Sequence, residues 1–180
     1  MTDIKIINKS VYDKKFHQNI AEYYMFYDSN IIPSLLIIVT LLILTIQSLT
    51  LKEYVYALVM GLFGIIIFPG LFFLLPYFIN VNRYKTMMKK TGGKPFAIST
   101  EINNNHIKCK TSLNETFIIH YNEIQELILY KNEILIIKSK KDKPLYIKED
   151  GYLQSNADNC HRFLMKKTNL HILKKPGRNK

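Results

Sequence analysis

The sequence contains no tryptophan and only two cysteines, and this scarcity excludes several kinds of site. Cys109 and Cys160 form no CxxC pair, and no cysteine or histidine pair has the spacing of a zinc site. Both cysteines lie in the part of the chain that we place in the cytoplasm, where thiols stay reduced, so no disulfide framework is expected. We expect the two thiols to act as small buried hydrophobes.

Catalytic motifs are also missing. Neither GxSxG nor a phosphate-binding loop occurs, and Gly92 and Gly93 have the character of a turn. No HExxH motif and no histidine pair at i and i+4 is formed by the five histidines, which are His17, His106, His120, His161 and His171. We therefore predict a protein that is not an enzyme, with no catalytic residue, metal or cofactor.

Charge is absent from two long stretches that are separated only by Lys52 and Glu53. The first stretch, residues 31–51, has 21 uncharged residues, and the second, residues 54–82, has 29. A helix needs about 20 apolar residues to cross roughly 30 Å of hydrocarbon, so two transmembrane helices are predicted, over residues 31–51 and 54–80. The short connection makes them an antiparallel hairpin. Two buried helices of a soluble core are the alternative, but such helices rarely lack charge over this length.

Positive charges flank the hairpin unevenly, and this predicts its orientation. Only Lys52 lies at the tip. Nine lysines and arginines lie near the other ends, at Lys5, Lys9, Lys14, Lys15, Arg83, Lys85, Lys89, Lys90 and Lys94. By the positive-inside rule, we expect a multi-pass protein of the cytoplasmic (inner) membrane with both termini in the cytoplasm.

Acidic residues are scarce in the second half of the chain. Five of the 25 basic residues and five of the 14 acidic residues precede residue 83, which leaves 20 basic and nine acidic residues after it. Aromatic residues do not alternate with these lysines, so anionic membrane lipid is a simpler partner than nucleic acid. The candidate lipid contacts are Arg83, Lys85, Lys89, Lys90 and Lys94, and a role in topology alone is the alternative.

Small residues recur along the second uncharged stretch. Ala57, Gly61 and Gly64 stand at i, i+4 and i+7 and form a smooth strip on which another helix can pack closely. We expect this strip to pack on the first stretch, with self-association of hairpins as the alternative. Pro69 and Pro76 predict a kink in the second half of the stretch. No ionisable residue lies inside either stretch, which argues against transport.

The rest of the chain shows strand and helix periods. A short strand is compatible with the first dozen residues, and an amphipathic helix is predicted from Asp13 to Tyr27. From Phe96 onward, apolar and polar residues alternate in about six short runs with turns between them, as in FAISTEI, which is typical of an antiparallel meander. Helical period returns over residues 156–168, with Ser155 or Asn156 as the N-cap.

These features predict a membrane α+β protein: a two-helix transmembrane hairpin followed by a small antiparallel β-sheet domain with one C-terminal α-helix. The predicted parts are an N-terminal strand and juxtamembrane helix (1–29), the transmembrane hairpin (30–82), a basic juxtamembrane helix (83–94), the β-sheet domain (95–173) and a disordered basic tail (174–180).

This order of parts resembles the YcxB-like family of small bacterial membrane proteins. The likeness is carried by FHQNIAEYYMFYDSN, by NRYKTMMKK, and by the run from TEINNNHIKCK through YNEIQELILYKNEILIIKS to LYI. The resemblance implies that residues 95–173 form a bacterial pleckstrin-homology-like (PH-like) domain, a bent sheet closed by a helix. Tyr121 stands where such proteins often have a tryptophan. The family has no established common activity, so the resemblance implies no reaction.

Two functions follow as hypotheses. In the first, a non-enzymatic membrane protein displays its PH-like interaction module at the cytoplasmic face and binds a protein partner, anionic lipid or both. In the second, the protein gives immunity against a membrane-active toxin or bacteriocin, because some bacteriocin immunity proteins resemble it in size and layout. The sequence alone leaves both hypotheses open.

Overall fold

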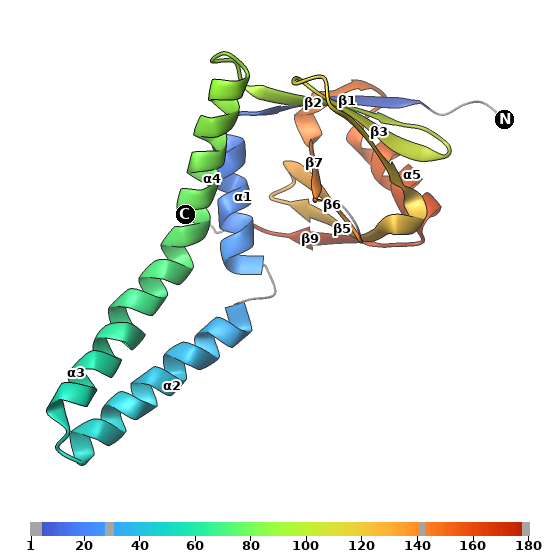
Figure 1. Cartoon of the computed structure of the whole chain (residues 1–180). Coiled ribbons are helices and arrows are strands. Elements are labelled where there is room, and N and C mark those ends of the chain that lie inside the picture. The colour runs from blue at the N-terminus through green and yellow to red at the C-terminus, as the bar shows by residue number, and fades with distance from the viewer. Residues whose placement is uncertain (1–4, 28–30, 141–142, 178–180) are drawn as a thin grey trace. The chain divides into compact units, whose positions relative to one another are not determined.

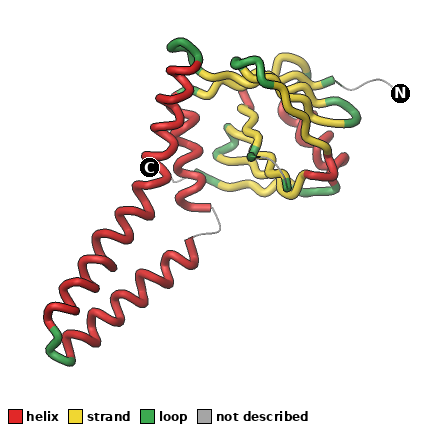
Figure 2. The backbone as a smooth tube through the Cα atoms, viewed as in Figure 1, coloured by secondary structure: helices red, strands yellow, loops and turns green. Residues whose placement is uncertain are grey.

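The computed structural model describes residues 5–27, 31–140 and 143–177, and the chain divides into two compact units. The sheet unit consists of Met1–Asp13 and Thr86–Lys180, and the helical unit is Lys14–Lys85. All the strands and the last helix belong to the sheet unit, whereas the long helices begin in the helical unit (Figures 1 and 2). The helical unit is therefore an insertion between the first two strands of the sheet unit.

Five strands form the first sheet of the sheet unit, in the order β4-β3-β2-β1-β8. Their bounds are β1 Ile6–Tyr12, β2 Phe96–Ile102, β3 His106–Thr111, β4 Thr116–His120 and β8 Tyr152–Gln154. Every second residue of β1, β2 and β3 is buried, because alternate side chains of a strand point to the same face. That face covers the core.

Four strands form the second sheet, in the order β7-β6-β5-β9. Their bounds are β5 Ile124–Tyr130, β6 Ile134–Ser139, β7 Leu145–Lys148 and β9 Ile172–Lys175. The pairs β5–β6 and β6–β7 are antiparallel, whereas β9 runs parallel to β5. The second half of β5 and the first half of β6 are buried without alternation, so both faces of the sheet are covered there.

Helix α5 (Ala157–Thr168) packs its apolar side into the sheet unit. The Asn156 side chain caps the start of the helix, because its oxygen accepts a hydrogen bond from the backbone amide of Asn159 at 2.9 Å. Asn169 ends the helix in a left-handed conformation with φ 57°. Cys160, Phe163 and Leu164 recur at three and four residues and are buried. The predicted closing helix and its Asn156 cap are thus confirmed.

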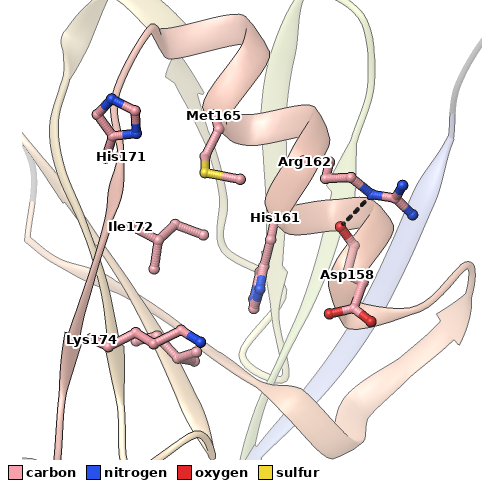
Figure 3. Close-up of a pocket in the computed structure, with 8 residues that line it drawn as sticks. Asp158, His161, Arg162, Met165, His171, Ile172 and Lys174 are labelled. Carbon is pink, nitrogen blue, oxygen red and sulfur yellow. Dashed lines mark hydrogen bonds between the residues drawn. The ribbon is translucent and has the colours of Figure 1, made fainter.

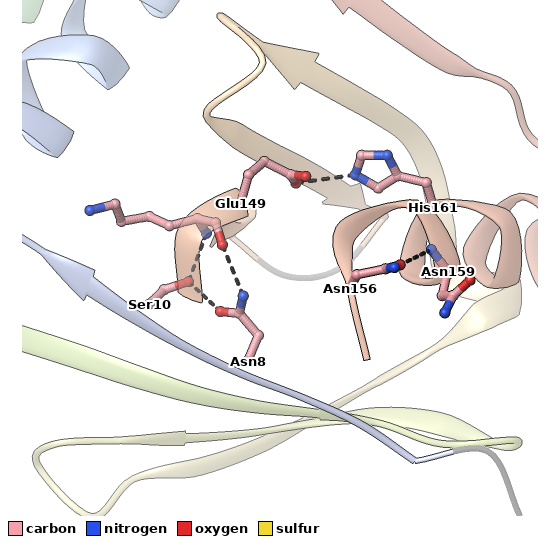
Figure 4. A network of polar contacts seen from close by, with 7 residues as sticks. Asn8, Ser10, Glu149, Asn156, Asn159 and His161 are labelled. Carbon is pink, nitrogen blue, oxygen red and sulfur yellow. Dashed lines mark hydrogen bonds and ion pairs between the residues drawn. The ribbon is translucent and has the colours of Figure 1, made fainter. Parts of the chain in front are cut away.

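A buried polar network joins the two sheets (Figure 4). In β1, Asn8 and Ser10 are fully buried. The Asn8 amide donates to the carbonyl oxygen of Lys148, at the end of β7, at 2.9 Å, and the Lys148 amide donates to the Ser10 hydroxyl at 2.7 Å. The Ser10 hydroxyl in turn donates to the Asn8 side-chain oxygen at 2.7 Å. Two side chains of one sheet therefore satisfy both backbone groups of a residue in the other.

The helical unit begins with α1 (Lys14–Tyr27), which confirms the predicted amphipathic helix. It continues with α2 (Ile31–Thr50), α3 (Tyr54–Leu62), one π-helical turn (Phe63–Ile67) and α4 (Phe68–Lys90), whose last residues belong to the sheet unit. The rings of His17 in α1 and Tyr84 in α4 lie 5.6 Å apart. The π-helical turn ends two residues before Pro69, which has no amide hydrogen to donate to the preceding turn, so helical irregularity occurs near the predicted kink.

The predicted transmembrane spans require correction. In the described part of the chain, no helix combines the length and the apolar character that a bilayer crossing demands. The second span, 54–80, is divided by the π-helical turn, and α4 ends in a charged segment. This finding contradicts the spans 31–51 and 54–80 and the multi-pass membrane localisation inferred from them.

The predicted class of the β domain also requires correction. The strands lie in two sheets, and β9 adds a parallel pair to the expected antiparallel meander. β1 pairs along its full length with β2, so the N-terminal strand belongs to the sheet unit. The basic tail was predicted to be disordered from residue 174, but Lys174 and Lys175 lie within β9. Residues 178–180 fall outside the described residues.

Candidate functional site

A groove with a volume of about 460 Å³ lies between α5 and β9 in the sheet unit (Figure 3). It is lined by Leu129 of β5, by Asp158, His161, Arg162 and Met165 of α5, and by His171, Ile172 and Lys174 in or next to β9.

Helical period explains why α5 contributes four of these side chains. Asp158, His161, Arg162 and Met165 stand at i, i+3, i+4 and i+7 and therefore share one face of the helix. The apolar residues that α5 buries lie on its other side. The helix thus packs with one face and lines the groove with another.

The opposite wall depends on strand pairing. Ile172 and Lys174 are alternate residues of β9, so their side chains point to the same side (Figure 3). Parallel pairing with β5 places Ile172 beside Leu127 and Lys174 beside Leu129. The buried Leu129 forms part of the apolar surface of the groove.

The cationic groups of the groove differ in how strongly they are held. Arg162 is exposed, but its Nη2 donates to the Asn159 side-chain oxygen at 2.8 Å and its Nε donates to the Asp158 carbonyl oxygen at 3.4 Å. The side chains of His171 and Lys174 are also exposed, and among the described residues neither side chain makes a hydrogen bond or an ion pair. The Lys174 ammonium is therefore available to an acidic ligand.

His161 connects the groove to the interior. Its Nε2 lies 3.1 Å from the Glu149 carboxylate, and both side chains are only 14% exposed. Glu149 begins the short 3-10 turn Glu149–Gly151 between β7 and β8. The contact, visible in Figure 4, thus fixes the orientation of α5 on this turn and engages one ring nitrogen of His161.

The two thiols are unsuited to nucleophilic chemistry. Cys160, next to His161 in sequence, is fully buried, and burial raises the pKa of its thiol from 9.0 to about 12. Burial raises the pKa of Cys109 to about 12 as well. Because the thiolate is the reactive form, neither group is a nucleophile near neutral pH. Burial also raises the pKa of the Tyr152 hydroxyl, with Cys160 as the second cause.

The groove therefore combines two kinds of surface. Leu129, Met165 and Ile172 are apolar, whereas Arg162 and Lys174 supply positive charge beside them. Asp158 is the one carboxylate among the lining residues. Such a surface suits a ligand that carries both acidic and apolar groups.

The predicted lipid contacts do not form one cluster. Arg83, Lys85, Lys89, Lys90 and Lys94 are all exposed, and the first four lie in α4. By helical period, Arg83 and Lys90 share one side of α4, whereas Lys85 and Lys89 share another. Lys94 follows the turn in which Gly92 and Gly93 have positive φ values of 64° and 83°.

The predicted helix-packing residues lie where α3 and the π-helical turn meet α2. Ala57 is 4% exposed. A methyl group added at Gly61 would lie 3.5 Å from Thr45 Cγ2, and one added at Gly64 would lie 3.0 Å from Leu41 Cβ. The strip therefore packs within the hairpin, as the first of the two alternatives expected.

None of the groove residues was singled out as a site from the sequence. The spacing of Asp158, His161, Arg162 and Met165 was visible, but it describes any polar helix face. The groove exists because the chain returns as β9 beside α5. A strand of four residues gives too weak a sequence pattern to be predicted.

Comparison with known proteins leaves the chain unassigned, because no family model and no curated protein matches it. Metal binding finds no support in the described residues, in which no group of three or more potential ligand side chains comes together.

Proposed function

We propose that the sheet unit is a non-enzymatic interaction module whose groove binds an acidic segment of a partner protein. The observation that carries the proposal is the position of the unpaired, exposed Lys174 beside the apolar side chains of Met165 and Ile172. A carboxylate of the bound segment would form an ion pair with the Lys174 ammonium. A neighbouring apolar side chain of the same segment would pack on the apolar surface of the groove.

Charge complementarity supports an acidic partner. The chain carries a formal net charge of +11, and the basic excess lies after residue 82. A positive surface of this kind attracts acidic segments over a distance and speeds their encounter.

A protein segment fits better than a lipid headgroup. A headgroup offers phosphate and hydroxyl groups, which would leave the apolar surface formed by Leu129, Met165 and Ile172 without a matching group. A peptide presents charged and apolar side chains in alternation, so it can satisfy both surfaces. The affinity should fall as salt rises, because the cations are exposed and screened.

The experiment measures binding of fluorescein-labelled glutamate–leucine peptides to the full-length protein by anisotropy, with lysine–leucine peptides as the charge control. The variant Lys174→Glu reverses a charge in the groove, and Lys166→Glu is the matched control because Lys166 is an exposed lysine of α5 that does not line the groove. We expect Lys174→Glu to weaken binding about tenfold, from a lost attraction and an added repulsion of up to about 1 kcal/mol each.

Equal effects of the two variants would contradict the proposal, because the peptide would then sense net charge alone. Vesicles of phosphatidylserine and of phosphatidylcholine form a second arm. Lys174-dependent binding to phosphatidylserine without peptide binding would identify lipid as the ligand and would overturn the proposal.

A further inference from the structure

Exposed large hydrophobic residues of the sheet unit occur only on edge strands, among the residues that the structure describes. They are Ile118 of β4 at 45% exposed, Leu153 of β8 at 67% and Leu173 of β9 at 49%. β4 and β8 are the two edges of the first sheet, and β9 is an edge of the second. Edge strands expose unpaired backbone groups, so an apolar side chain on them marks a site at which a further strand can pair.

β4 differs from the other three edges in its lack of protection. β8 has three residues, and β7 and β9 have four each, with lysines in both and Pro176 directly after β9. β4 has five residues, Thr-Phe-Ile-Ile-His, without a lysine, an acidic residue or a proline. Short length, lysine and proline are the features that usually keep an edge from pairing with another chain. β4 is therefore the edge most open to a further strand.

The turn between β3 and β4 shows which backbone groups of β4 face β3. The amide of Thr111 donates to the carbonyl oxygen of Glu115 at 2.9 Å, so these two residues form a bonded pair. In an antiparallel ladder, bonded and non-bonded pairs alternate. The next bonded pairs are then Cys109 with Phe117 and Ile107 with Ile119.

The other end of β3 gives the same result. The amide of Asn103 donates to the carbonyl oxygen of His106 at 3.2 Å, so the backbone of His106 faces β2. His120 lies opposite His106, and its backbone must point away from β3. The outward residues of β4 are thus Thr116, Ile118 and His120. The amide of His120 is held by the Glu123 carboxylate at 3.2 Å, and no hydrogen bond to the amides of Thr116 and Ile118 is formed by the described residues.

We propose that β4 pairs with β4 of a second copy of this chain, antiparallel, about a twofold axis through Ile118. In this register Ile118 lies opposite Ile118 of the partner and Thr116 lies opposite His120. The outward amide and carbonyl groups of the two Ile118 residues bond in both directions, and the Thr116 amide donates to the His120 carbonyl oxygen of the second copy, whereas the His120 amide keeps its bond to the Glu123 carboxylate. These bonds join two five-stranded sheets into one.

A second copy is the favoured occupant because the strand is self-complementary. The register that pairs all five residues places Phe117 opposite Ile119, apolar against apolar, and Thr116 opposite His120, polar against polar. No like charges come to lie opposite one another. Lys108, the cation nearest to Ile118 across the sheet, is on β3. It would be separated from its symmetry mate by three strand spacings, about 14 Å, which exceeds the Debye length at physiological salt.

The test is cysteine crosslinking of the full-length protein with a short bis-maleimide. Ile118→Cys places a thiol on the proposed axis, and Leu153→Cys places one on the opposite edge of the same sheet as the matched control. The native thiols of Cys109 and Cys160 are fully buried, so the unchanged chain gives the background. We expect crosslinked dimer as the main product for Ile118→Cys and background for Leu153→Cys.

A second variant keeps the test independent of non-specific association. Thr116→Pro removes an outward amide that the dimer uses, without removing a bond to β3, and proline is tolerated at the start of an edge strand. Combined with Ile118→Cys, it should reduce crosslinking to background, while circular dichroism and thermal unfolding stay unchanged. Equal crosslinking at Ile118 and Leu153, background crosslinking at both, or crosslinking that survives Thr116→Pro in the folded variant would overturn the proposal.

Discussion

The side-chain amide of Asn8 donates a hydrogen bond to the carbonyl oxygen of Lys148 across 140 residues of sequence. The Ser10 hydroxyl accepts a hydrogen bond from the backbone amide of the same lysine. The two side chains of β1 therefore take the place of a neighbouring strand for the backbone of Lys148. The chain around Gly151 packs closely on β1, because a methyl group added at Gly151 would lie 2.7 Å from the Lys9 carbonyl oxygen. A larger residue would not fit at this position. This contact is part of what holds the two sheets together.

Ser10→Ala should destabilise the protein. The change leaves the Lys148 amide without an acceptor in a buried position, and an unsatisfied buried group costs about 1–3 kcal/mol. Ser99→Ala, in the neighbouring strand β2, is the matched control because Ser99 is exposed, and it should change stability by less than about 0.5 kcal/mol. Urea unfolding measures both variants. Equal effects would show that the network contributes little.

Stability should fall at alkaline pH. In the folded protein the pKa values of Cys109 and Cys160 lie near 12, above the value of 9.0 for an ordinary thiol. Between about pH 9 and 12 the unfolded chain loses these protons and the folded chain keeps them, so the free energy of unfolding decreases as pH rises, by up to about 1.4 kcal/mol per pH unit for each thiol. Below pH 9 the thiols contribute no pH dependence.

Denaturant midpoints between pH 7 and pH 11 measure this effect. The same burial predicts that a thiol reagent leaves the folded chain unmodified and labels both cysteines once the chain is unfolded. Rapid labelling of the folded protein at pH 8 would contradict the assigned burial.

Gly64→Leu should loosen the helical hairpin. A side chain there would press on Leu41 of α2, and forcing extra atoms into a close helix contact costs about 1–3 kcal/mol. Gly70→Leu is the control, because among the described residues no atom outside the adjoining helix backbone lies within 4 Å of a methyl group added at Gly70. Thermal unfolding followed by circular dichroism should show a lower Tm for the first variant alone. A lower Tm for both would contradict the close contact as the cause, because leucine favours a helix more than glycine does and Gly70→Leu should not destabilise it.

Asn156→Ala should shorten or weaken α5. Without the side-chain oxygen the Asn159 amide has no acceptor, and loss of an N-cap costs about 1 kcal/mol. Asn156→Asp keeps an oxygen in place and should retain stability. Because α5 lines the groove, the alanine variant should also bind the glutamate–leucine peptides more weakly. Unfolding and anisotropy on the same samples separate the two effects.

Local patterns predicted the elements of the sheet unit well, and contacts distant in sequence were the part that failed. The alternation in FAISTEI and the helical period after Asn156 correspond to β2 and α5, because a single strand or helix shows its buried face in its own spacing. β9 could not be predicted in this way. It has four residues, two of them lysines, and it exists because β5 offers a free edge.

For the two uncharged stretches, by contrast, the local pattern itself led to a wrong prediction. Their lack of charge led to two uninterrupted spans, but hydropathy cannot show where the helical hydrogen bonds change partner. The chain uses a π-helical turn at Phe63–Ile67.

The groove was not predicted from the sequence, because His161 and Lys174 belong to elements whose proximity depends on the pairing of β9 with β5.

The position of β1 between β2 and β8 governs the order in which the chain can fold. Ile7 lies opposite both Glu101 and Gln154, so β1 finds its last partner, β8, only after the helical unit and strands β2 to β7 have been made. Closing loops of this length costs more entropy than forming the local helical hairpin, and folding slows as contact order rises. The helices should therefore form early, while β1 waits as an unpaired, half-apolar strand. Newly made chains are expected to depend most on chaperones during that interval.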